Sequence, residues 1–243
     1  KRIIFQVQIG FNKYNVYFTN SYYRFDSNFI RFSLFILSTK GVKPYLCRIK
    51  SNFAPDMTQV KIETERLVIR DFQKRDVVGL LEYLSNPRVN CFAADRLCSE
   101  EAAFVYMQYS QKDMQRYAVS LKKEDFIIGD VFVLRENEDT YNVGWHFNKR
   151  FEGKGLAREA VIGLLDYLFR EAGARRIYGF VEDDNIRSKR LCERLGMRRE
   201  GCFKEFVTFI NNPNGTPKYE DTRVYSILKK EWNSISAKSI TNN

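Results

Sequence analysis

The hexapeptide Glu152-Gly153-Lys154-Gly155-Leu156-Ala157 decides the fold, because it joins a strand-like segment to a helical one. Residues 141–147, just before it, are rich in β-forming residues. After it, apolar residues recur at helical spacing and form one face: Leu156, Ala160, Leu164, Leu165 and Leu168. The pattern predicts a strand that turns through two glycines into a long helix.

This predicted turn has the chemistry of an anion site. A helix N-terminus presents unpaired N–H groups, and its dipole favours negative charge there. Glycines let ligand oxygens approach the backbone, and Lys154 and Arg158 add positive charge. A phosphate or pyrophosphate is the expected ligand, although the same glycines alone would also fit an ordinary tight turn. The chain lacks both the Walker phosphate loop and a Gly-x-Gly-x-x-Gly after a strand, which excludes those two nucleotide-binding classes.

Periodicity and turn residues predict alternating strands and helices along the rest of the chain. Strands are expected at residues 66–70, 116–121, 126–134, 141–147, 176–181, 203–210 and 223–228. Helices are expected at residues 76–84, 99–113, 156–171 and 185–195. The fold class is therefore α/β, with a mixed sheet packed by helices (an α+β arrangement).

Five further motifs lie before and after the glycine turn. They are residues 64–70 (TERLVIR), Asn185-Ile186-Arg187-Ser188, Leu195-Gly196-Met197, Glu200-Gly201 and residues 219–228 followed by Glu231-Trp232. Together with the turn, they resemble the GNAT superfamily of acetyl-CoA-dependent N-acetyltransferases. Within it the chain is most similar to the RimJ/RimL branch, which acetylates N-terminal amines of ribosomal proteins and, in relatives, small amines. The resemblance covers residues 64 to 232.

The resemblance implies the GNAT acyl-CoA N-acyltransferase fold, a mostly antiparallel sheet splayed at its middle strands with helices on both faces. The pantetheine arm of acetyl-CoA would enter between residues 141–147 and 176–181. The implied cofactor contacts are Gly153, Lys154, Gly155, Leu156, Ala157 and Arg158 at the pyrophosphate, Phe147, Asn148 and Lys149 along the pantetheine, and Asn185 and Ser188 at the CoA arm. Glu152 departs from the Gln or Arg usual in the family, and we expect it to face solvent.

Five residues are catalytic candidates, and each also has a structural alternative. Ser188 matches a serine that assists the departing thiolate, or it hydrogen-bonds its own helix. Cys192 replaces a tyrosine acid, although a buried helix cysteine is more often inert core. His146, the single histidine, titrates near neutral pH or is structural. Glu205 is a candidate base, as is Asp221, and either could equally lie on a solvated face.

One further gap concerns the base. Asn142 stands where the branch often carries a glutamate. A water relay would have to remove the proton if no side chain does.

The first 56 residues differ from the remainder in composition. They carry nine Lys or Arg and two Asp, a net charge of +7 out of +10 for the whole chain. The net positive charge of the chain therefore says little about residues 57–243, and no nucleic-acid partner is expected. The first methionine is Met57. We expect residues 1–56 to lie outside the natural protein, 57–235 to form the acetyltransferase domain and 236–243 to be a C-terminal tail. The alternative for 1–56 is an anchor or basic arm.

Compartment and partners complete the expectations. The five cysteines have no metal-like Cys-x-x-Cys spacing, which favours a cytoplasmic protein with reduced thiols and no metal. Residues 29–37 are interrupted by Arg31 and are too short to span a bilayer, so no membrane partner is expected. The expected partners are an amine acceptor, either a protein N-terminus or a small molecule, and a second copy in a homodimer. A rival function is a non-catalytic acyl-CoA-binding or protein-interaction module.

Overall fold

The computed structural model describes residues 10–11, 14–15, 29–38, 41–50, 60–113 and 115–241. The chain divides into two compact units, Lys1–Phe53 and Ala54–Asn243. The first contains β1 (Gly10–Phe11) paired with β2 (Tyr14–Asn15), and β3 (Phe29–Ser38) paired with β4 (Gly41–Lys50), both antiparallel. Met57, the expected start of the natural protein, lies outside the described residues.

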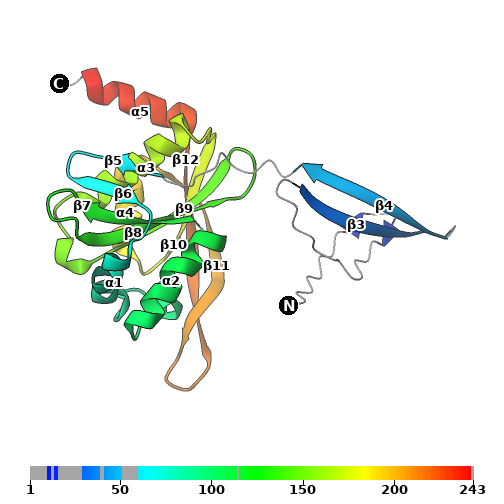
Figure 1. The fold of residues 1–243 in the computed structure, drawn as a ribbon, viewed down its shortest axis with the longest axis horizontal. Coiled ribbons are helices and arrows are strands. Elements are labelled where there is room, and N and C mark those ends of the chain that lie inside the picture. Colours follow the sequence, from blue (N-terminus) through cyan, green and yellow to red (C-terminus); the bar gives the residue numbers. More distant parts are fainter. Residues whose placement is uncertain are drawn as a thin grey trace. The chain divides into compact units, whose positions relative to one another are not determined.

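The second unit is built on one eight-stranded sheet in the order β11-β12-β10-β9-β8-β7-β6-β5 (Figure 1). The bounds are β5 (Ile62–Glu63), β6 (Leu67–Arg70), β7 (Gln115–Leu121), β8 (Ile127–Arg135), β9 (Thr140–Phe147), β10 (Arg176–Glu182), β11 (Arg198–Asn211) and β12 (Pro217–Leu228). Every neighbouring pair is antiparallel except β9 with β10, which is parallel. This confirms the mixed, mostly antiparallel sheet predicted from the sequence.

Helices cover both faces of the sheet, and each face has its own hydrophobic core. The larger core joins α3 (Leu156–Arg170), α4 (Ile186–Arg194) and Trp232 of α5 (Lys229–Thr241) to the sheet. The smaller core joins α1 (Val77–Leu84) and α2 (Glu100–Asp113) to β7 and β8. The apolar face predicted for α3 is fully buried, with Ala160, Leu164, Leu165 and Leu168 at 0% exposure.

The connecting segments contain short 3-10 helices at Lys74–Asp76 (η1), Asn90–Asp95 (η2) and Lys149–Phe151 (η3). Of these, η2 lies in the connection between α1 and α2. Among the described residues, no helix is long and apolar enough to cross a membrane.

The largest differences from the sequence prediction lie in the C-terminal part. β11 begins at Arg198 and β12 at Pro217, so both strands are longer than residues 203–210 and 223–228. β11 pairs irregularly with β12, with register shifts that include one between Phe203 and Val207. Such bulges break the alternation of apolar and polar residues on which the prediction rests. The helix α5 was not predicted, and it runs past residue 235, where we expected the domain to end.

Candidate functional site

The central feature of the sheet is a fork between β9 and β10. The two strands are paired only through Arg176–Thr140, Ile177–Tyr141 and Tyr178–Asn142. Beyond these three pairs, β9 stays paired with β8 as far as Phe147, and β10 stays paired with β12 as far as Glu182. The facing edges of the forked segments therefore have no strand between them, and their backbone groups are available to an extended ligand.

A cavity of about 250 Å³ occupies this fork, and we call it the fork cavity. It is lined by Cys91, Phe92, Asp95, Arg116, Phe132, Asn142, Val143, Gly144, Trp145, Gly179, Phe180, Val181, Glu182, Asn185 and Ser188. The lining combines four aromatic residues with polar residues such as Glu182, Asn185 and Ser188. Such a slot suits an arm that is largely apolar and carries amide groups.

The glycine turn follows β9 after the short helix η3. Gly153 has φ +78° and Gly155 has φ +74°, a left-handed conformation that a side chain would strain. Gly155 is the N-cap of α3, so the unpaired N–H groups of the first helical turn start here. Gly153, Lys154 and Arg158 are exposed, whereas Leu156 is buried and anchors the helix. The turn thus has the geometry that an anion site requires.

Arg66 supports this turn, and sequence reasoning missed it. Its Nη1 donates to the carbonyl oxygen of Lys154 at 3.0 Å, and its Nε pairs with Glu159 Oε2 at 2.6 Å. Glu159 also accepts a hydrogen bond from Thr64 Oγ1 at 2.6 Å. The turn is therefore tied to the first strands of the sheet, in the segment 64–70 whose pattern contributed to the family resemblance.

Glu152 is exposed, as expected from the sequence. Its carboxylate pairs with Arg187 on α4 and with Arg88 Nη1, the latter at 2.8 Å. Hydrogen bonds from Arg187 first, and from Arg88 second, lower the pKa of Glu152. The two guanidinium groups balance a negative charge that would otherwise oppose an anion at the turn.

Ser188 and Asn185 both line the fork cavity, at the start of α4. The side chain of Asn185 accepts a hydrogen bond from the backbone N–H of Ser188 at 3.1 Å, so it caps the helix. Ser188 Oγ accepts a hydrogen bond from Trp145 Nε1 at 3.3 Å across the fork. The structure thus brings Ser188 to the cavity with its hydroxyl facing β9.

The three residues predicted along the pantetheine are placed differently from one another. Phe147 is half-buried and packs against the larger core, and Lys149 is exposed. Asn148 is buried, and its Nδ2 donates to Glu82 Oε2 of α1 at 2.8 Å while its Oδ1 accepts from Arg150 N–H at 3.0 Å. The side chain of Asn148 therefore organises η3, and none of the three lines the fork cavity.

Cys192 and His146 also lie outside the cavity lining. Cys192 is 0% exposed in the larger core, and burial raises the pKa of its thiol to about 12. His146 is buried beneath Phe92 and Tyr83, with its Nδ1 3.5 Å from Asp130 Oδ1. Their surroundings favour the structural alternative for both residues, and their catalytic roles stay predictions.

Glu205 and Asp221 are near each other, and neither residue lines the fork cavity. Glu205 is exposed at φ +46°, in the irregular part of β11. Its backbone N–H donates to Asp221 Oδ1 at 2.9 Å, and Lys204 Nζ lies 2.6 Å from Asp221 Oδ2. Asp221 is thus already paired, and the structure places neither carboxylate in the fork.

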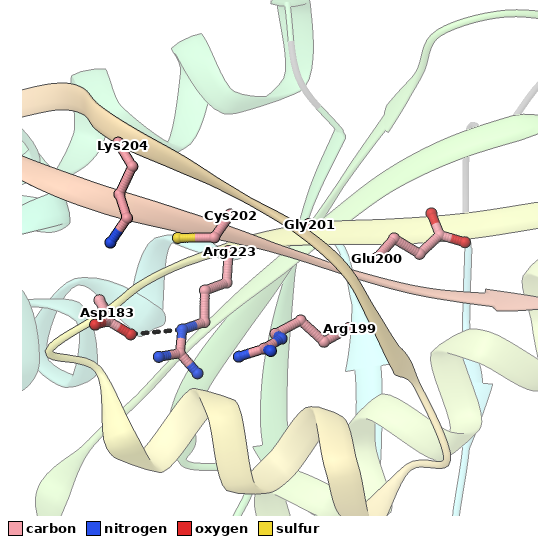
Figure 2. Close-up of a pocket in the computed structure, with 7 residues that line it drawn as sticks. All are labelled: Asp183, Arg199, Glu200, Gly201, Cys202, Lys204 and Arg223. Atoms are coloured by element: carbon pink, nitrogen blue, oxygen red, sulfur yellow. Dashed lines mark ion pairs between the residues drawn. The ribbon is translucent and has the colours of Figure 1, made fainter.

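A second cavity, of about 330 Å³, lies beside the β11–β12 hairpin, and we call it the hairpin cavity. It is lined by Asp183, Arg199, Glu200, Gly201, Cys202, Lys204 and Arg223. Figure 2 shows the ion pair at its side, in which Arg223 Nε lies 2.5 Å from Asp183 Oδ1. It shares no lining residue with the fork cavity.

Glu182 is the functional candidate that sequence reasoning missed. It ends β10, lines the fork cavity and is only 9% exposed. Burial raises the pKa of its carboxyl group. One feature of the sequence could have identified Glu182. It lies three residues before the helix cap Asn185, where a strand ends and a helix begins beside the fork.

Comparisons with known proteins agree with this geometry. Residues 66–198 match the model of the acetyltransferase (GNAT) domain. The chain is 36% identical over 174 residues to the uncharacterized N-acetyltransferase YnaD of Bacillus subtilis, covering 71% of this chain and 99% of that protein. It is 23% identical over 191 residues to the [ribosomal protein uS5]-alanine N-acetyltransferase of Escherichia coli, covering 68% and 97%.

A solved structure shows the same likeness in three dimensions. The GNAT-family acetyltransferase from Bacillus anthracis superposes with a TM-score of 0.63 at 31% identity, covering 70% of this chain and 99% of that one. A sheet forked at its centre, a glycine turn at the end of the fork and these matches lead to one conclusion: the chain is an N-acetyltransferase of the GNAT family.

Proposed function

We propose that the chain transfers an acetyl group from acetyl-CoA directly to a primary amine within the fork cavity. The observation that carries this proposal is the fork itself, which stays open between β9 and β10 after three residue pairs and leads to the glycine turn. The pantetheine would add to the free strand edges, and the pyrophosphate would lie at the N-terminus of α3.

The reaction requires little covalent work from the protein. A thioester is already activated, so an amine attacks it without a covalent enzyme intermediate. Holding two reactants in position can lower a barrier by roughly 7–11 kcal/mol, whereas one general acid or base contributes about 10²–10⁴-fold. Residues that position acetyl-CoA are therefore expected to matter most.

The proposed roles follow from the placements. Backbone N–H groups at Gly153, Gly155 and the first turn of α3 would bind the pyrophosphate, with Lys154 and Arg158 as mobile cations nearby. Ser188 is held at the cavity by its contact with Trp145, and it would assist departure of the CoA thiolate. Glu205, Cys192 and His146 remain less favoured candidates.

The acceptor is a primary amine, either a protein N-terminus or a small amine. The similarity to the uS5-alanine N-acetyltransferase of Escherichia coli supports an N-terminal amine. The rings that line the fork cavity, among them Phe92 and Phe180, would accept the apolar part of either kind of substrate.

The test is a panel of small primary amines and ribosomal-protein N-terminal peptides, with release of the CoA thiol as the signal. We expect at least one amine to give CoA release above the rate of acetyl-CoA hydrolysis. Calorimetry with acetyl-CoA is run beside the panel. Binding of acetyl-CoA without release for any amine would overturn the transferase and leave a non-catalytic acyl-CoA-binding module.

A further inference from the structure

The carboxylate of Glu182 is buried in the fork cavity without a matching cation. Within the described part of the chain, no lysine or arginine forms an ion pair with it, and the side chain is only 9% exposed. Isolated carboxylates are seldom buried, because loss of hydration strongly disfavours their charge. An uncompensated carboxylate in a binding cavity therefore points to a ligand that brings the missing positive charge or proton.

Nearby carboxylates add to this imbalance, whereas hydrogen bonds to Glu182 stabilise its charged form. Cys91 of η2 interacts with its carboxylate, while Glu220 of β12 and Asp184 before α4 add negative potential. Across the same cavity lie Asp95 and Arg116, which pair with each other at 3.4 Å.

Arg116 is occupied further. It also lies 3.5 Å from the fully buried Asp130. Among the described residues, Arg116 is the one guanidinium that lines the cavity, and it already contacts two carboxylates, so Glu182 is left for the substrate.

Register shows which face Glu182 serves. It is the Cα partner of Thr222 on β12, and residues two apart on a strand share a face, so Glu220 lies on the same side. Asn90 of η2 donates to Glu220 Oε1 at 2.7 Å, which places this face under η2. Thr222 is 2% exposed and its Oγ1 has no hydrogen-bond partner. This face lies opposite α3 and α4, on the side where residues of η2 line the fork cavity.

We infer that Glu182 is the base that takes the proton from the acceptor ammonium in the fork cavity, an assignment that rests on the proposed function. A carboxyl group whose pKa is raised by burial suits this role, since a base works best when its pKa approaches the working pH. Glu182 replaces Glu205 as the favoured candidate for the base, because Glu182 lines the fork cavity and Glu205 does not.

The transfer exchanges a C–S bond for a C–N bond and moves two protons. Glu182 takes one proton from the ammonium and frees the nitrogen lone pair, which forms the N–C bond to the thioester carbon while the carbonyl π pair moves to oxygen. When the carbonyl re-forms, the C–S bond breaks and its electron pair leaves on sulfur. The second N–H proton ends on that sulfur, which gives the amide and the CoA thiol. The proton on Glu182 then passes to water.

The decisive variant is Glu182→Gln, which keeps the shape of the side chain and removes the base. With the panel amine that the parent acetylates fastest, we expect kcat to fall about 10²–10³-fold at pH 7, with unchanged affinity for acetyl-CoA. The rate should then rise about tenfold per pH unit up to the pKa of the amine, since the substrate must lose its proton unaided. Glu182→Asp should recover part of the rate.

The matched control is Asp184→Asn, which removes a neighbouring exposed carboxylate. It should keep kcat and lower the pH at which activity appears, because one negative neighbour of Glu182 is gone. Thermal unfolding supplies a second readout. A raised folded-state pKa means that Glu182 stabilises the protein at low pH and destabilises it as the pH rises. Glu182→Gln should therefore raise Tm at pH 8, which a misfolded variant would not do.

Two results would overturn the assignment of Glu182 alone. One is a Glu182→Gln enzyme with the parental kcat and pH profile. The other is a raised KM for the amine with kcat retained at saturation, which would make Glu182 a binding residue. If the parent itself releases no CoA with any amine, the proposed function fails and this assignment fails with it.

Discussion

The fork cavity and the hairpin cavity each contain a glutamate, and the protein treats the two carboxylates in opposite ways. Burial without a cation raises the pKa of Glu182. Glu200 in the hairpin cavity accepts hydrogen bonds from Arg176 and Arg198, and the Arg176 contact is the main cause that lowers its pKa to about 2. In the fork cavity the carboxylate has no cationic partner among the described residues, whereas in the hairpin cavity arginines of the same chain neutralise it.

This difference indicates that the fork cavity is the functional one. The hairpin cavity is the larger of the two, at about 330 Å³ against about 250 Å³. Most of its charges are nevertheless paired by neighbouring strands, which is typical of structural ion pairs. Within the described structure, the fork cavity combines strand edges that have no neighbouring strand with a carboxylate that has no ion pair. The smaller cavity is therefore the one with groups available to bind a substrate.

The largest effect is expected from Gly155→Glu. A glutamate there would put a negative charge at the anion turn, and at φ +74° its backbone would be strained. We expect the affinity for acetyl-CoA, measured by calorimetry, to fall by more than about a hundredfold, or about 2.8 kcal/mol. Gly215→Glu is the matched control, because Gly215 has φ +84° at the tip of the β11–β12 hairpin. If Gly155→Glu bound acetyl-CoA as tightly as the parent does, the assignment of acetyl-CoA to the glycine turn and the fork would be wrong.

Ser188→Ala should give the next largest effect, a fall in kcat of about 10–10³-fold with little change in acetyl-CoA affinity. This signature belongs to an interaction made mainly in the transition state. Ser234→Ala is the control, because Ser234 Oγ donates to the carbonyl of Lys230 within α5. A loss of affinity with kcat retained would instead make Ser188 an anchor for CoA.

Arg176→Met should give the smallest effect, and it tests the hairpin cavity. In the parent, Glu200 contributes stability above pH 4.5, its unfolded value, and loses it as the pH falls toward about 2. The variant should lose about 0.5–1 kcal/mol at pH 7, since partial exposure screens the pair, and the difference should vanish near pH 2. Urea unfolding at the two pH values measures it. A fall in kcat would contradict the purely structural role assigned to this ion pair.

The local signals of this chain were enough to predict its central strand, turn and helix. The glycine turn, the buried face of α3 and the helix over residues 185–195 depend on residues close together in the sequence, and periodicity records such contacts directly. The family resemblance supplied the fork, because nothing in residues 141–147 or 176–181 alone indicates that two parallel strands separate after three pairs.

The catalytic carboxylate could not be predicted in the same way. Glu205 and Glu182 look alike in sequence, since each lies on a predicted strand or at its end. Their difference arises from tertiary structure: a bulge exposes Glu205, whereas η2 and β12 cover Glu182. Burial of a polar side chain depends on elements that are distant in the sequence, and local patterns do not encode it.

The three residue pairs at the base of the fork also have a mechanical consequence. The sheet consists of a five-strand ladder from β5 to β9 and a three-strand ladder from β10 to β12, joined by one short seam and by α3 across their back. A ligand that bonds to both ladders acts as a missing strand and completes the sheet. Its binding energy is then added to the stability of the whole domain, by about 2.7 kcal/mol at a hundredfold excess over Kd. If acetyl-CoA binds in the fork as proposed, the protein should be most resistant to unfolding and proteolysis when acetyl-CoA is abundant.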